Sequence, residues 1–220
     1  MNAISRRERD FIRREQEILT ASTRLFSTDC WELVTVEQIA READIAKGTL
    51  YKHFSSKEEL YARLCLDFYQ QLQEKIRQLD NNLSPTATLR EIIMISFNHY
   101  LTHPAPARVS FYCERQDFKE RLKEETKARY INSEKEFIET MSELMKRGME
   151  AKEFPQRPLE ELMFGLEATF RGTMMLIWNS ANYCWSDQPM DTQQMINWTC
   201  DYMIAGITGC TKPLAPVNHN

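Results

Sequence analysis

The chain of 220 residues lacks the features of several large protein classes. No apolar run is long enough to span a bilayer, and the N-terminal stretch MNAISRRERD lacks the apolar segment of a secretory signal peptide. Glycine is scarce, with six residues, and none of them forms a glycine-rich loop that would cradle a phosphate. These absences exclude an integral membrane protein and a P-loop nucleotide-binding protein, and they predict a soluble, cytoplasmic one.

Paired metal ligands and disulfide frameworks are also missing. Six cysteines occur at wide intervals with no C-x-x-C pair: Cys30, Cys65, Cys113, Cys184, Cys200 and Cys210. Several of them occupy apolar helical positions, which fits reduced thiols in a cytosolic protein. His99 and His103 have the i, i+4 spacing of a helical metal site, but the sequence fixes no third ligand. We predict no metal and no other cofactor.

Enzyme signatures are absent as well. The sequence has no G-x-S-x-G motif and no evident pair of catalytic carboxylates, so we do not expect an enzyme. The net charge of −4 does not by itself indicate nucleic acid binding. Basic residues are nevertheless clustered in two places, residues 1–14 and residues 46–57. These clusters, rather than the net charge, indicate that any nucleic-acid-binding surface lies in the N-terminal quarter of the chain.

The stretch TVEQIAREADIAKGTLYKHFSSKEEL, residues 35–60, carries the most informative pattern. Thr35 is followed three residues later by Gln38, which forms a capping box, and Val34 with Ile39 forms a hydrophobic staple at the same helix start. A short amphipathic helix is therefore predicted from Thr35. A second short helix follows after only a few residues, from Lys47 to Phe54. This order predicts a helix-turn-helix.

The second of these helices has the composition of a DNA-binding surface. From Ala46 to Lys57 the sequence contains three lysines, one histidine, several hydroxyl groups and no carboxylate. Gly48 permits close backbone approach, and the free N–H groups at a helix start favour an anion. Ser56 and the glutamate three residues later predict a second capping box. Lys57 in its first turn is unfavourable for the helix dipole unless a phosphate compensates for it.

These residues resemble the TetR/AcrR family of transcriptional regulators. The resemblance is carried by three motifs: Thr35-x-x-x-Ile39-Ala40-x-x-Ala43, Lys47-Gly48-Thr49-Leu50-Tyr51-x-His53-Phe54 and Ser56-Lys57-Glu58-x-Leu60. Together with the helix that precedes them they cover about fifty residues, which is far more specific than one short motif. Cys30 and Asp44 stand where the family usually has glycine. Aspartate tolerates left-handed backbone conformations better than most residues, whereas Cys30 is less easily accommodated.

The predicted partner is a double-stranded DNA operator. Thr35, Tyr51, His53 and Lys57 are candidates for phosphate contacts, and Lys47, Gly48 and Thr49 are candidates for positions closest to the base edges. Ala46 and Lys52 complete the candidate DNA-binding set. A pair of recognition helices related by a twofold axis would read two half-sites, so the operator is expected to be a near-palindrome.

The predicted fold is all-α, with nine helices and no strand. Residues 1–10 are expected to form a basic N-terminal arm, either entering the minor groove or remaining a disordered tail. Residues 11–56 form the predicted DNA-binding domain of three helices. Residues 57–210 form the predicted regulatory, ligand-binding and dimerisation domain, and 211–220 a disordered tail. The helices of the regulatory domain are predicted at 57–79, 88–101, 107–113, 117–148, 158–182 and 191–207.

Two apolar surfaces are expected in the regulatory domain. The helices at 159–182 and 191–207 are too apolar to face water and would pair with the same helices of a second chain, as the resemblance also implies. The resemblance further implies a pocket for an effector between helices. Methionine and aromatic side chains suit a lipophilic molecule, and the candidates are Phe97, Tyr100, Phe111, Tyr112, Phe137, Met141, Met163, Phe170, Arg171, Met174 and Trp178. A packed core is the alternative interpretation for each of them.

The sequence thus predicts a homodimeric, ligand-responsive regulator, most simply a repressor, and leaves alternatives open. Glu167 and Arg171, four residues apart, are expected to form an intrahelical pair, with Arg171 either holding an anionic ligand group or bordering the dimer interface. An adaptor of the same fold would instead bind a protein partner through its second domain. A third alternative is a redox sensor that uses Cys113 or Cys184.

Overall fold

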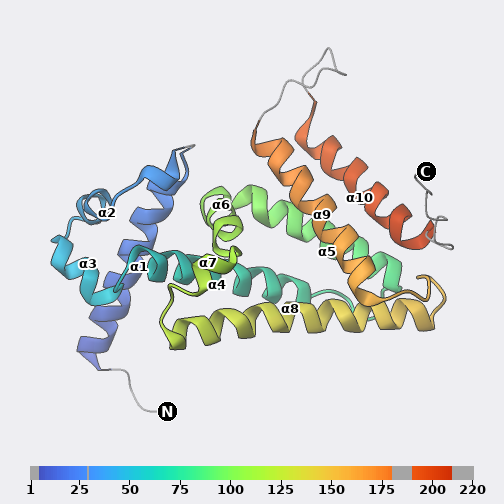
Figure 1. Ribbon diagram of the computed structural model, residues 1–220, viewed down its shortest axis with the longest axis horizontal. Helices are drawn as coiled ribbons and strands as arrows, with labels where there is room; N and C mark the ends of the chain where they lie inside the picture. The colour runs from blue at the N-terminus through green and yellow to red at the C-terminus, as the bar shows by residue number, and fades with distance from the viewer. Residues whose placement is uncertain (1–4, 29, 180–189, 210–220) are drawn as a thin grey trace, which may run out of the picture. The chain divides into compact units, whose positions relative to one another are not determined.

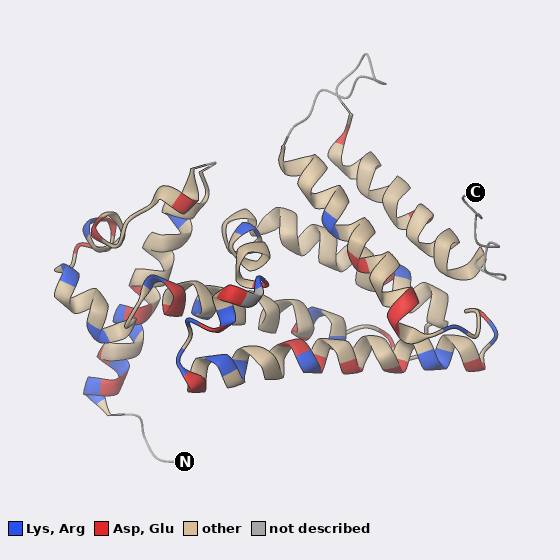
Figure 2. Cartoon of the chain, in the orientation of Figure 1, with Lys and Arg blue, Asp and Glu red and all other residues tan. Residues whose placement is uncertain are grey.

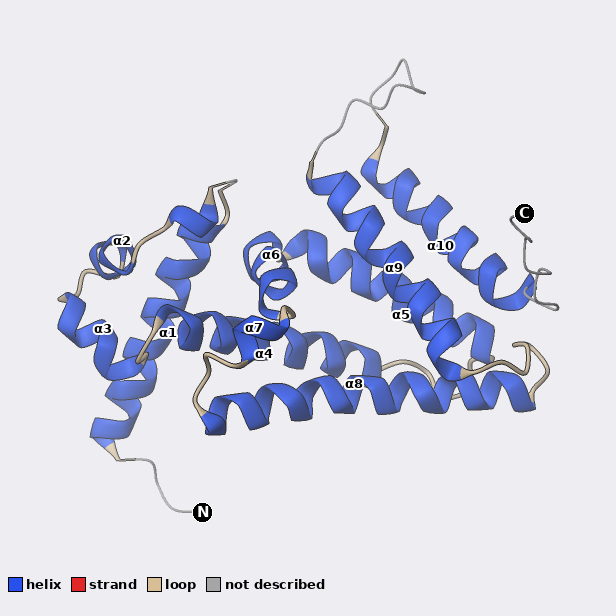
Figure 3. Cartoon of the chain, in the orientation of Figure 1, coloured by secondary structure: helices blue, strands red, loops and turns tan. Residues whose placement is uncertain are grey.

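The computed structural model describes residues 5–28, 30–179 and 190–209. Within these ranges it contains ten α-helices, one short 3₁₀-helix and no strand, which confirms the all-α prediction (Figures 1 and 3). The helices are α1 (Arg6–Phe26), η1 (Trp31–Leu33), α2 (Val36–Glu42), α3 (Lys47–His53), α4 (Lys57–Arg77), α5 (Pro85–Thr102), α6 (Pro104–Cys113), α7 (Gln116–Lys119), α8 (Glu124–Glu150), α9 (Leu159–Trp178) and α10 (Thr192–Gly209).

The helices form two compact units. The first contains the described residues up to Gln71 together with Tyr100–Lys135, and the second contains Leu72–His99 and the described residues from Glu136 onward. Helices α6 and α7 and the first turns of α8 therefore belong to the same unit as the helix-turn-helix. The prediction had assigned them, by function, to the domain at 57–210. That functional division remains a prediction.

The first unit is built around α1. This helix packs against α2 and α6, and α2 packs against α3. Its core includes Ile18, Phe26, Leu50 and Leu60, none more than 1% exposed. An aromatic cluster extends this core, with ring centroids 5.3–6.1 Å apart among Phe26, Trp31, Tyr61 and Tyr112. Buried apolar area is the main favourable term in folding, so this core fixes the short helices α2 and α3 in place.

The predicted signals for the helix-turn-helix are confirmed. The Thr35 hydroxyl accepts a hydrogen bond from the Gln38 N–H at 3.2 Å, and the Gln38 side chain accepts one from the Thr35 N–H at 2.7 Å, which closes the capping box. Between α2 and α3 the backbone of Asp44 is left-handed, with φ 51°. This explains why the position favours glycine and tolerates aspartate. Cys30 has φ −98°, which any residue adopts.

The beginning of the chain differs from the prediction. We expected a mobile arm over residues 1–10 and a first helix from Phe11, but α1 begins at Arg6. The reason is a capping box that was overlooked: Ser5 accepts from the Glu8 N–H at 3.2 Å, and Glu8 accepts from the Ser5 N–H at 2.8 Å. Residues 6–10 are therefore helical, and only residues 1–4 of the predicted arm lie outside the described residues.

Further helix boundaries require correction, and α6 begins at Pro104 rather than at Ala107. The long charged helix predicted at 117–148 is divided into α7 and α8, because the chain turns between them and buries Phe118 and Leu122 in the core of the first unit. Helix α5 begins at Pro85 rather than Thr88, since Ser84 supplies the cap by accepting the Ala87 N–H at 3.3 Å. The charge pattern concealed the first break, and a proline at the first helical position is compatible with the earlier start.

The second unit contains the end of α4, most of α5, the remainder of α8, and α9 and α10. Helices α9 and α10 pack against each other, and the hydroxyl groups of Thr173 and Thr199 lie 3.3 Å apart between them. Asp191 caps α10 as predicted, accepting the Gln194 N–H at 2.8 Å. The tail predicted at 211–220 and the end of the helix predicted to reach residue 182 lie outside the described residues.

Candidate DNA interface

Helix α3 has a buried side and a basic exposed side. Leu50 and Phe54 are 1% and 4% exposed and anchor the helix on the core of the first unit. On the other side Lys47, Gly48 and Lys52 are exposed, and Tyr51 is 44% exposed although it is a large aromatic residue. The predicted recognition surface is therefore accessible. Figure 2 shows the lysines of α3 as blue segments at its start and near its end.

Lys47 already has a partner. Its ammonium forms an ion pair with the carboxylate of Glu37, in the first turn of α2, and lies 5.8 Å from the ring centroid of Tyr51. The hydrogen bond to Glu37 and the attraction between the two charges raise the pKa of Lys47, and the same hydrogen bond lowers the pKa of Glu37. Lys47 therefore stays charged, and DNA would compete with Glu37 for it.

Lys57 is directed toward the segment before α2. Its ammonium donates to the backbone carbonyl of Glu32 at 3.0 Å and lies 5.2 Å from the ring centroid of Tyr61. Burial lowers the pKa of Lys57. The lysine at this helix start is thus compensated by a carbonyl dipole in the free chain, which was not anticipated from the sequence.

His53 stacks on Phe11 of α1, with ring centroids 4.1 Å apart. Its Nδ1 is buried and has no hydrogen-bond partner among the described residues. Burial lowers the pKa of His53, Glu15 raises it and Arg14 lowers it. The lowered pKa of His53 favours the neutral imidazole near pH 7.

Thr35 is the N-cap residue of α2, and Thr49 is the third residue of α3. The Thr35 hydroxyl accepts a hydrogen bond within its capping box, and the residue is exposed. Ala46 caps α3 without a side-chain hydrogen bond. An open hollow of about 480 Å³ is lined by α2, the turn after it and the start of α3, and Glu37 and Lys47 both line it. Glu37 is the residue at this surface that sequence reasoning missed, because a carboxylate in a first helical turn is ordinary.

The predicted effector residues are distributed over both units. In the second unit Phe97 and Phe170 lie with ring centroids 4.6 Å apart, and Phe97, Met174 and Met141 are 0%, 0% and 4% exposed. Phe137, Met163 and Trp178 of that unit are half-buried. Arg171 forms the predicted intrahelical ion pair with Glu167.

The remaining three effector candidates belong to the first unit. Tyr100 packs against Phe68 at 4.8 Å and against Phe111 at 5.8 Å, measured between ring centroids. Tyr112 lies in the aromatic cluster with Trp31 and Tyr61. The set predicted as one pocket is therefore divided between the two compact units, with eight members in the second and three in the first.

The histidine and cysteine positions have ordinary surroundings. His99 is buried with its Nδ1 3.0 Å from the ammonium of Lys75, while His103 lies 3.0 Å from the Thr102 hydroxyl. Cys113 is fully buried, and burial raises the pKa of its thiol, which disfavours the reactive thiolate. Cys184 lies outside the described residues. No group of three or more His, Cys, Asp or Glu side chains suited to a metal ion occurs within the described ranges.

The helices give no sign of a membrane span. Among the residues that the structure describes, none of the helices combines the length and the apolar character required to cross a bilayer.

Comparison with known proteins identifies the class. Residues 18–64 match the family described as bacterial regulatory proteins, tetR family. The HTH-type transcriptional repressor KstR2 of Mycobacterium tuberculosis is 27% identical over 197 residues, which cover 89% of this chain and 93% of that relative. The fold and these matches show that the chain belongs to the TetR family of DNA-binding transcriptional regulators.

Solved structures of regulators share the fold. The ketosteroid transcriptional regulator KstR2 of Mycobacterium tuberculosis superposes with a TM-score of 0.60 at 24% identity, covering 89% of this chain and 95% of that one. The transcriptional regulator FadR of Bacillus subtilis, in complex with stearoyl-CoA, superposes with a TM-score of 0.63 at 18% identity, covering 87% and 98%. The likeness extends along nearly the whole chain and is not limited to the helix-turn-helix.

Proposed function

We propose that the chain is a repressor that binds a near-palindromic operator as a homodimer and releases it when a lipophilic small molecule binds. The observation that carries the DNA-binding part is the orientation of α3. Its apolar residues Leu50 and Phe54 are buried, and its basic start is exposed. The proposed contacts are those predicted from the sequence: Thr35, Ala46, Lys47, Gly48, Thr49, Tyr51, Lys52, His53 and Lys57.

Exposed apolar side chains on α9 and α10 support a homodimer. Phe164 and Tyr202 are 76% and 72% exposed, and Trp198 is 53% exposed. Phe164 and Met175 lie on one side of α9 by their spacing, and Trp198 and Tyr202 lie on one side of α10. An apolar area of this kind is unfavourable in water, and pairing with the same area of a second chain would remove it. The twofold pair would place two α3 helices on successive half-sites.

The proposed effector is lipophilic because the second unit is rich in methionine and aromatic side chains. Regulators of the same fold carry names that refer to ketosteroids and a complex with stearoyl-CoA, which favours a large apolar molecule. Phe97, Phe170, Met174 and their neighbours in that unit would line its site, with Arg171 available for an anionic group. Release requires an effector that binds the DNA-free conformation more tightly, with a typical coupling of about 1–3 kcal/mol.

Native mass spectrometry of the purified full chain tests the proposal. The expected result is a dimer that carries a lipophilic molecule or takes up added stearoyl-CoA, which then weakens operator binding in a titration. Stearate without the CoA group serves as a second probe, because it separates recognition of the acyl chain from recognition of the nucleotide. A dimer that takes up neither probe and carries nothing, but copurifies with one protein, would favour the adaptor alternative. A monomer at micromolar concentration would contradict the two-half-site arrangement.

A further inference from the structure

Three helix starts in the first unit carry a capping box in the sequence, and only two of the boxes are closed. At Ser5 and at Thr35 the third residue of the helix returns to the backbone N–H of the cap, at 2.8 Å and 2.7 Å. At Ser56 the first half of the box is present, since the Glu59 N–H donates to the Ser56 hydroxyl at 3.2 Å. The second half is absent, because both oxygens of the Glu59 carboxylate have other partners.

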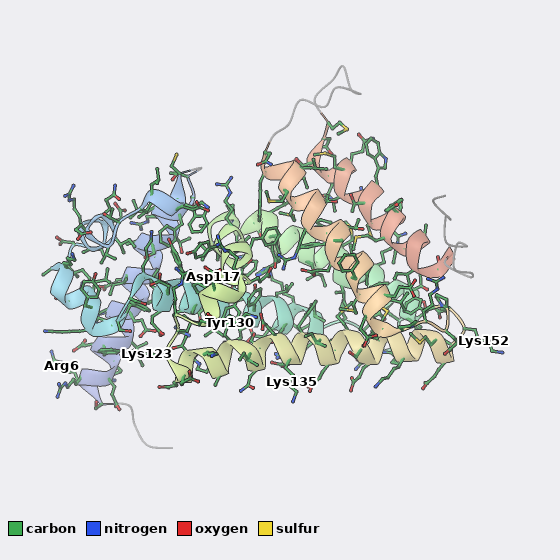
Figure 4. The ribbon with its side chains drawn as sticks, viewed as in Figure 1. Arg6, Asp117, Lys123, Tyr130, Lys135 and Lys152 are labelled. Carbon is green, nitrogen blue, oxygen red and sulfur yellow. The ribbon has the colours of Figure 1, made fainter. Side chains whose placement is uncertain are left out.

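The Glu59 carboxylate caps a different helix. One oxygen accepts the backbone N–H of Lys123 at 2.7 Å, and the other accepts the hydroxyl of Thr126 at 2.6 Å. Lys123 is the N-cap residue of α8, as its carbonyl accepts the N–H of Lys127 at 2.8 Å. Figure 4 labels Lys123 at the start of α8. In a complete capping box a glutamate at the third position of α8 would accept the Lys123 N–H. This chain has Thr126 at that position, and Glu59 of α4 accepts the Lys123 N–H instead.

The neighbouring residues make the same connection on both sides. Glu58 lies 3.8 Å from Arg121, in the link between α7 and α8. Lys57, one residue earlier, donates to the carbonyl of Glu32, which precedes α2. Three consecutive residues in the first turn of α4 thus bind the segment before α2 on one side, and the α7–α8 link and the start of α8 on the other. All of these residues belong to the first unit.

We infer that Glu59 is a positioning residue for DNA binding, with two alternative partners. In the present arrangement it ties the start of α8 to the first turn of α4. When the start of α8 moves away, the carboxylate closes its own capping box on the Ser56 N–H, so that the loss of one set of hydrogen bonds is offset by another. The position of α8 and the position of the helix-turn-helix on α4 are then linked through one side chain. This inference rests on the proposed DNA-binding function.

Linkage between two sites is reciprocal, so operator binding must change the stability of the hydrogen bonds at the start of α8. Hydrogen–deuterium exchange of the full chain measures this at the amides of residues 123–127, with and without an operator obtained by selection from a random duplex library. In the wild-type chain the operator should change their exchange rates by about fivefold or more, the lower end of typical coupling. In Glu59→Ala this response should be lost, while the amides of α3 remain protected by DNA.

Matched variants separate positioning from a general loss of structure. Glu59→Gln keeps an acceptor oxygen and should restore part of the response. Glu134→Gln removes a contact of the same kind, because Glu134 binds Lys119 at 2.6 Å and joins α7 to α8 without reaching α4. It should respond to the operator like the wild-type chain. If Glu59→Ala does not fold, Thr126→Val gives the same test with the Lys123 bond left in place.

Different results would contradict the role of Glu59 and the proposed DNA binding by α3. Unchanged exchange at 123–127 in the wild-type chain, while α3 is protected by the operator, would overturn the role of Glu59 and leave DNA binding intact. An equal response in the wild-type chain and in Glu59→Ala would do the same. Failure of any duplex to protect α3 would instead contradict the proposed function.

Discussion

Glu37 and Lys47 form an ion pair across the helix-turn-helix, between the first turn of α2 and the first residue of α3. Both side chains are about half exposed, and they line the hollow between the two helices. The Lys47 ammonium, proposed to lie nearest the base edges, is therefore already paired with a carboxylate in the DNA-free chain. Because Glu37 itself would face the negatively charged operator, its carboxylate opposes binding to any duplex.

Replacing that carboxylate should strengthen DNA binding without regard to sequence. We expect Glu37→Gln to raise the affinity for operator and non-operator duplexes alike by about two- to fivefold, since exposed ion pairs are weak. The salt dependence should become steeper by about one phosphate contact. Fluorescence anisotropy at several salt concentrations measures both quantities.

Glu42→Gln is the control, because Glu42 ends the same helix and lies 3.5 Å from Arg24 rather than from a residue of α3. It should leave the salt slope as it is in the wild-type chain. A slope for Glu37→Gln that equals the wild-type slope would mean that the Lys47 ammonium adds no electrostatic attraction for DNA when Glu37 releases it.

Lys57 provides a second test of the proposed interface. Lys57→Ala should weaken binding to all sequences and lower the salt slope by about one, as expected for the loss of one phosphate contact. The variant also loses the hydrogen bond to the Glu32 carbonyl, so a urea titration must accompany the binding measurement. A lower stability with an unchanged salt slope would assign Lys57 to holding α4 against the segment before α2 and remove it from the DNA interface.

His53 predicts a pH dependence of stability. Its pKa lies below the ordinary value of 6.5 in the folded chain because of burial, so the unfolded chain binds the proton more readily. The contribution of His53 is therefore fully present above pH 6.5 and is lost as the pH falls through the lower, folded pKa. The free energy of unfolding, measured with urea between pH 7.5 and 5, should decrease less for His53→Gln than for the wild-type chain. An identical decrease in both proteins would remove His53 as the cause.

Gly148 is required by close packing within the second unit. A Cβ at this position would overlap the ring of Phe154, whose backbone N–H donates to the Gly148 carbonyl at 3.0 Å. We expect Gly148→Ala to lower the free energy of unfolding by about 1–3 kcal/mol, as overpacking does. The double variant with Phe154→Leu should be less destabilised than the sum of the two single variants. Strict additivity would show that the overlap is not the cause.

Local signals explain how much was predictable from the sequence. The capping box at Thr35, the left-handed Asp44 and the cap at Asp191 depend on residues three or fewer positions apart, and each was confirmed. The same kind of signal at Ser5 was overlooked because the arginines around it suggested a mobile arm. The break before α8 was not predictable in this way, since its cap comes from Glu59, more than sixty residues earlier.

The interface was predictable only in part. Exposure of Lys47 and burial of Leu50 follow from helical spacing, whereas the partners Glu37 and Glu32 come from other elements and carry no signal of their own. The effector residues were chosen by composition alone. Composition does not determine which aromatic side chains meet, and this is why Tyr112 was grouped with Phe170 although it packs against Trp31 and Tyr61.

The central claim, that two copies of the chain read two half-sites through α3, is tested most directly by selecting operators from a random duplex library and weighing the complex by native mass spectrometry. The account predicts a near-palindromic consensus and an even number of chains on each duplex, with enrichment abolished in a Lys47→Ala and Tyr51→Ala double variant. Enrichment of an asymmetric single site bound by one chain, or no enrichment by the wild-type protein, would contradict it.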